Sequence, residues 1–139
     1  MDPQELFERM IEAWNGHDGD GFVATFAEDC EVSSPVLTGH GHEVVRQFWE
    51  LYDWAFPDYH VITHRIVVES DTVVEESTFQ GTHTGPLHPT DGSEDIPPTG
   101  ARVEVPYAAI YTVRSDKFVS SRMYWDQMAI MGQLGLLPE

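Results

Sequence analysis

The spacing of apolar residues changes near residue 56, and this change constrains the fold more than any other feature of the sequence. Before it, apolar residues recur at intervals of three and four, which is typical of helices that bury one face. After it come long segments rich in β-branched residues, which is typical of strands. Helices followed by strands predict an α+β fold, with helices on one face of a curved, mostly antiparallel sheet.

The first half is predicted to contain three helices. Asp2 precedes Pro3, which fits an N-cap residue followed by proline at the first helical position. The third helix follows a glycine-rich loop and is expected to end before Pro57. The predicted elements of this half are helices over 3–14, 20–26 and 42–55, a strand over 30–33 and a loop over 37–41.

The second half is predicted to form four antiparallel strands, over 60–69, 73–83, 102–113 and 118–128. The segment 84–100 contains four prolines and three glycines, and it is too long for a tight turn, so we expect a loop that borders a site or moves. Apolar side chains occur on both faces of the strand 102–113. Helices cover one face, so a second copy of the chain is expected to cover the other, as a homodimer.

The chain length favours one domain over residues 1–139. The net charge of −17 argues against nucleic acid and anionic membranes as partners. It favours a halophilic acidic surface, suited to a salt-rich cytoplasm, over a surface for a cation or a basic protein. No apolar run is long enough for a membrane span, and the single cysteine fits a reducing compartment, so a cytoplasmic location is expected.

Asp126 is a carboxylate within an otherwise apolar, aromatic segment at the end of the last predicted strand. Burial would raise its pKa and make it a candidate general acid or base. Alternatively, Asp126 caps a helix that begins near Gln127, or it faces solvent. The local pattern does not choose between these interpretations.

Several short motifs occur in an order that resembles a known family. They are Gly39-His40-Gly41 before the third helix, FQGTHTG over 79–85, PPTG over 97–100, YWD over 124–126 and QLG over 133–135. Together they resemble the SnoaL-like polyketide cyclases, or ester cyclases, which have the nuclear transport factor 2-like cone fold. The resemblance implies a cofactor-free cyclisation of an apolar carbonyl compound in a pocket of the cone, with Asp126 at the position of the family's acid/base.

With Asp126 directed into the pocket, strand alternation places Tyr124 in the pocket lining and Arg122 near its far end or mouth. Arg122 would then lower the pKa of Asp126 and keep it ionised as a base. The alternative for Arg122 is a salt bridge to Glu75, Glu76 or Glu104 on the neighbouring strands.

His83 is the second polar candidate, because it begins the long loop where a strand opens to the expected pocket. It would donate a hydrogen bond to a substrate carbonyl, or else serve only the structure. Trp14, Trp49 and Tyr107 are expected in the core or as pocket walls that bind substrate.

No metal is expected, because the pairs His40/His42 and His60/His64 lack further ligands at suitable spacing. The family resemblance implies that no cofactor is needed. Two other functions remain. One is a non-catalytic protein that binds a small ligand in the same fold. The other is an epoxide hydrolase of the limonene type, whose Asp-Arg-Asp trio is not visible in the sequence.

Overall fold

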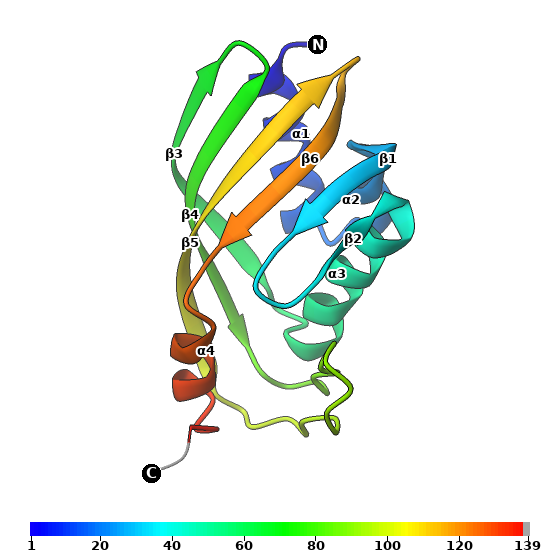
Figure 1. The fold of residues 1–139 in the computed structure, drawn as a ribbon. Coiled ribbons are helices and arrows are strands. Elements are labelled where there is room, and N and C mark those ends of the chain that lie inside the picture. Colours follow the sequence, from blue (N-terminus) through cyan, green and yellow to red (C-terminus); the bar gives the residue numbers. More distant parts are fainter. Residues whose placement is uncertain (138–139) are drawn as a thin grey trace.

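A curved six-stranded sheet wraps around three helices in the computed structural model, which describes residues 1–137 (Figure 1). The strand order is β2-β1-β6-β5-β4-β3, and every neighbouring pair is antiparallel except β1 and β6, which run parallel. The fold class was therefore predicted correctly. The elements are α1 (Pro3–Asn15), α2 (Gly19–Ala24), β1 (Phe26–Ser33), β2 (Thr38–His40), α3 (Gly41–Ala55), β3 (His60–Glu69), β4 (Thr72–Thr82), β5 (Arg102–Arg114), β6 (Lys117–Tyr124) and α4 (Gln127–Gln133).

Three details differ from the sequence prediction. The segment expected as a loop over 37–41 contains the short strand β2, whose Gly39 lies opposite Val32 of β1. Strand β1 begins at Phe26 rather than at residue 30. Strand β6 ends at Tyr124, because the chain turns there into a fourth helix, α4, that the strand prediction over 118–128 had absorbed.

Helix α1 begins as its sequence predicts. The Asp2 carboxylate accepts a hydrogen bond from the Glu5 N–H at 2.8 Å, and Pro3 is the first helical residue. The apolar face of α1 lies against the sheet and buries Leu6, Phe7, Met10 and Trp14. None of the helices in the described part of the chain is long and apolar enough to span a bilayer.

Alternation along β4 places one carboxylate on the inner face of the sheet. Val73, Glu75, Ser77 and Phe79 are buried, while the residues between them are more exposed. Strand β5 continues this inner face, with Ala109 opposite Glu75 in the antiparallel register. The Glu75 side chain therefore lies on the face of the sheet that the helices cover.

The outer face of the sheet exposes apolar side chains over three strands. Val67 and Val74 are directly opposite on β3 and β4, and 44% and 38% of their surfaces are exposed. Tyr124 of β6 is 56% exposed on the same face, opposite Ala108 of β5. An apolar face of this kind is the feature from which the sequence predicted a homodimer.

We expect light scattering to show twice the mass of one chain, and Val74→Lys to shift the protein towards the monomer, because a charge would be buried in the contact. Val68→Lys is the matched control: Val68 is 39% exposed but lies opposite Val73, on the inner side of the sheet. A monomeric wild-type protein at micromolar concentration would contradict the dimer.

Candidate functional site

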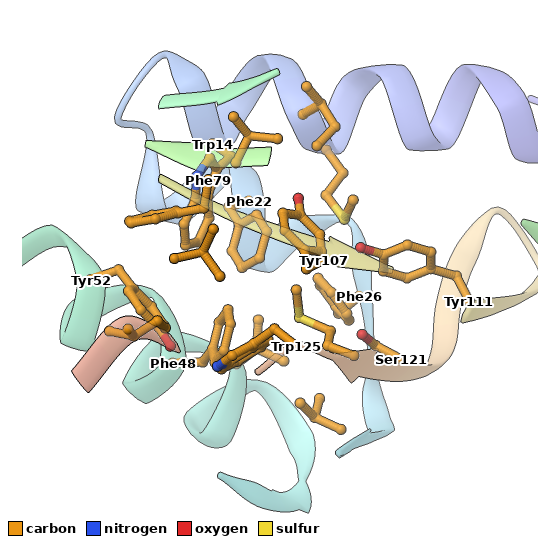
Figure 2. Close-up of a pocket in the computed structure, with 18 residues that line it drawn as sticks. Trp14, Phe22, Phe26, Phe48, Tyr52, Phe79, Tyr107, Tyr111, Ser121 and Trp125 are labelled. Atoms are coloured by element: carbon orange, nitrogen blue, oxygen red, sulfur yellow. The ribbon is translucent and has the colours of Figure 1, made fainter. Parts of the chain in front are cut away.

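A narrow apolar cavity lies between the three helices and the inner face of the sheet (Figure 2). Its volume is about 70 Å³, and eighteen residues line it, half of them aromatic. The helices contribute Trp14, Phe22, Phe48 and Tyr52 among these aromatic side chains. A cavity of about 150 Å³ with an apolar lining holds benzene. This cavity is smaller, so a ligand the size of benzene or larger requires side chains to move, and Met10 and Met123 in the lining are flexible enough to do so.

Tyr107 and Tyr111 line the cavity and also surround the buried carboxylate of Glu75. The Tyr107 hydroxyl donates to Glu75 Oε2 at 2.8 Å, and the Tyr111 hydroxyl donates to Oε1 at 2.6 Å. Ser77 Oγ donates to Oε2 at 2.7 Å. Three charge-assisted hydrogen bonds thus hold a carboxylate that is fully buried and has no ion pair among residues 1–137.

Both tyrosines remain protonated. Burial, and then the nearby charge of Glu75, raise the pKa of Tyr107 and of Tyr111 well above the ordinary value. Each phenol therefore keeps the proton that it donates to Glu75. Tyr107 was predicted as a pocket wall and lies there; Tyr111 and Glu75 were not predicted as part of a site.

Trp14 also lines the cavity, as predicted, and it leaves a polar atom unsatisfied. Its side chain is 5% exposed, and its Nε1–H has no hydrogen-bond acceptor among the described residues. A buried N–H without an acceptor costs free energy. An acceptor atom on a ligand in the cavity would remove that cost.

Asp126 does not line the cavity. It is exposed and forms the N-cap of α4, where its Oδ1 accepts a hydrogen bond from the Ala129 N–H at 3.1 Å. The expectation of a buried carboxylate at this position was therefore wrong, and the alternative, a cap on a helix that begins at Gln127, is confirmed. Whether Asp126 takes part in a reaction stays a prediction.

The face of β6 that points into the cavity is the opposite of the one expected. Ser121, Met123 and Trp125 line the cavity, whereas Arg122 and Tyr124 are exposed on the outer face. The predicted alternation was correct, but its direction was inverted, because the assignment started from a buried Asp126. Contacts of Arg122 and Tyr124 with a substrate stay predictions that this orientation does not favour.

His83 is fully buried, but outside the cavity lining. Its Nδ1 accepts a hydrogen bond from the Thr99 N–H at 3.2 Å, and its ring centroid lies 5.4 Å from that of Phe56. The His83 backbone bonds to Ala101 and Gly100, so this residue joins the two ends of the loop 84–100. These contacts agree with the structural alternative considered for His83.

Trp49 was expected in the core or as a pocket wall; it packs against the core and does not line the cavity. Its ring packs against Gly19, where a side chain would collide with it, and its Nε1 donates to the Tyr59 hydroxyl at 2.9 Å. Trp49 therefore holds α2 against α3.

Glu75 could have been found from strand alternation. Phe79 is the large apolar residue of β4, and a strand that directs Phe79 inward also directs Ser77 and Glu75 inward. Glu75 was considered only as a possible salt-bridge partner of Arg122. Its buried position is thus implied by a pattern that was visible.

Comparisons with known proteins agree with the fold. The chain belongs to the SnoaL-like polyketide cyclase family, whose family model matches residues 4–134. Membership supports a function of the cyclase or isomerase type in general, with a small molecule as ligand. No protein in a search of curated sequences matches the chain.

Solved structures share the fold at low sequence identity. AclR from Streptomyces galilaeus is 24% identical, with 98% of this chain and 86% of that chain covered and a TM-score of 0.82. TsrD from Streptomyces laurentii is 24% identical, with 99% of each chain covered and a TM-score of 0.82. A protein from Catenulispora acidiphila with a ketosteroid isomerase-like fold is 20% identical, with 99% and 96% covered and a TM-score of 0.78.

The environment of His83 predicts a pH dependence of stability. Burial lowers the pKa of His83, and the Gly85 carbonyl opposes this shift only in part. The unfolded chain therefore binds a proton that the folded chain does not, below the ordinary histidine value of about 6.5. The part of the free energy of unfolding that depends on neutral, buried His83 is present above that pH and is lost as the pH falls below it.

Between pH 7 and pH 5, the free energy of unfolding should fall more in the wild type than in His83→Gln, because only the wild type carries the buried imidazole. Urea denaturation at each pH measures this difference. His60→Gln, at an exposed position, is the control and should follow the wild type. Equal pH dependence of wild type and His83→Gln would show that His83 titrates normally in the fold.

Proposed function

We propose that this protein is a cofactor-free enzyme of the cyclase or isomerase type, which acts by acid–base chemistry on a small, largely apolar carbonyl compound bound in the cavity. One observation carries the proposal: an apolar cavity in a chain of this family presents only a few polar groups, from Trp14, Tyr52, Tyr107, Tyr111, Ser121 and Trp125. Apolar walls with a few oriented polar groups are typical of small-molecule sites.

The family resemblance assigns the acid/base to Asp126. In support, Asp126 directly follows Trp125, which lines the cavity. Against it, Asp126 is exposed and its carboxylate caps α4. Catalysis by Asp126 would require the start of α4 to turn towards the cavity when a substrate binds.

A non-catalytic protein that binds a small ligand is the second candidate, and the capping role of Asp126 favours it. An epoxide hydrolase of the limonene type has less support. The described lining contains neither aspartate nor arginine, the residues that its trio requires.

The proposed site is tested with small ketones, in a thermal-shift assay on the wild type and on Met123→Trp. Met123 lines the cavity, so tryptophan there should fill it and remove the stabilisation that a ketone gives the wild type. Met128→Trp is the matched control, because Met128 is 62% exposed. Equal stabilisation of both variants by the same ketones would place binding outside the cavity.

A further inference from the structure

Glu75 is the one buried carboxylate on the inner face of β4, and the proposed role of Asp126 leaves it without a function. Burial of a carboxylate is costly even with good hydrogen bonds, and a well-packed apolar residue would often serve the fold as well. The cost is compensated here by three hydroxyl donors, and two of them belong to side chains that line the cavity. The carboxylate thus bonds directly to two side chains of the cavity wall.

Tyr107 connects Glu75 to the cavity. Its hydroxyl donates its proton to Glu75 Oε2 at 2.8 Å, and a phenol oxygen that donates one hydrogen bond still has lone pairs that can accept another. A proton arriving at this oxygen can therefore displace the phenol's own proton onto Glu75. Tyr107 remains neutral before and after this exchange, in agreement with the raised pKa of its hydroxyl.

Trp14 supplies the complementary group. Its Nε1–H is a buried donor without an acceptor among residues 1–137, and its side chain lines the same cavity. The carbonyl oxygen of a ligand would satisfy it, and more strongly once that oxygen becomes an enolate. The cavity wall thus combines a donor for an oxygen with an acceptor for a proton.

Resting on the proposed function, we propose that the cavity enolises a small apolar ketone, with Trp14 Nε1–H donating to its oxygen and Tyr107 passing its α-proton to Glu75. The α-carbon–hydrogen bond breaks, and its electron pair forms the enolate. The α-proton binds to the Tyr107 oxygen as the phenol proton moves to Glu75 Oε2. The reverse transfer returns a proton to carbon, so no cofactor is consumed.

The probe is cyclohexanone in D₂O, whose α-hydrogen exchange is followed by NMR. The wild type should accelerate the exchange. Deuterium reaches the α-carbon once the proton that Glu75 has accepted exchanges with solvent. Glu75→Gln should lower the enzymatic rate by about 10²–10⁴-fold, the usual loss when a general base is removed, while cyclohexanone still binds. A lower rate at unchanged affinity is expected if Glu75 accepts the proton, whereas a purely structural role would lower both.

Glu76→Gln is the matched control, since it makes the same chemical change one residue along β4 on the exposed face, and it should exchange at the wild-type rate. Tyr107→Phe keeps the ring and removes the relay, so it should also lower the rate by about 10²-fold or more. It provides an independent test in case Glu75→Gln does not fold, which circular dichroism would show.

Trp14→Phe tests the oxygen site. It should weaken cyclohexanone binding by about three- to tenfold, the usual effect of one hydrogen bond. Methylenecyclohexane has nearly the same shape without the oxygen, and its affinity should not change. Equal losses for both compounds would mean that Trp14 contributes packing alone, and would overturn its assignment.

One result separates this inference from the proposed function, and two others bear on both. Exchange that persists in Glu75→Gln and Tyr107→Phe but disappears in Asp126→Asn would overturn the inference and leave the proposed enzyme with Asp126 as its base. Binding without accelerated exchange would overturn the inference and favour the non-catalytic ligand-binding protein. If cyclohexanone does not bind at all, both are overturned.

Discussion

The inner face of the cone depends on the burial of one carboxylate, Glu75, among three hydroxyl groups. The antiparallel register sets Ala109 opposite Glu75, and Tyr107 and Tyr111 lie two residues to either side on β5. Hydrogen bonds to a charged group contribute about 1.5–3 kcal/mol each, and a buried carboxylate that loses its donors costs several kcal/mol. The two rings that wall the cavity are therefore held in place by the charge behind them.

The two notable carboxylates of the chain have different surroundings. Asp126 is exposed and fixes the start of α4, whose first residue, Gln127, accepts a hydrogen bond from Trp125 Nε1 at 2.8 Å. The cap thus helps to hold Trp125 over the cavity. Glu75 lies inside, among donors that belong to the cavity wall. Asp126, the polar residue that stands out most in the sequence, caps a helix. Glu75, which is less conspicuous in the sequence, lies beside the cavity.

Local patterns predicted most of the fold, because helices and strands with one buried face carry a periodic signal. The cap at Asp2, the four antiparallel strands and the outer apolar face were all visible. The site was predicted less well. The prediction assumed that Asp126 was buried. It therefore assigned the wrong face of β6 to the interior and placed Tyr124 inside. The position of Trp49 depends on close packing against Gly19, which has no local signature. The cavity itself depends on how large side chains pack together, which no single segment encodes.

The most direct test of the central claim is a crystal structure of the protein soaked with cyclohexanone. We expect the ketone inside the cone, with its oxygen about 2.7–3.2 Å from Trp14 Nε1 and an α-carbon facing the Tyr107 hydroxyl, while that hydroxyl still donates to Glu75. A ketone whose reactive carbons face Asp126, with α4 displaced towards the cavity, would contradict the account. So would a cavity that remains empty while the ketone binds on the surface.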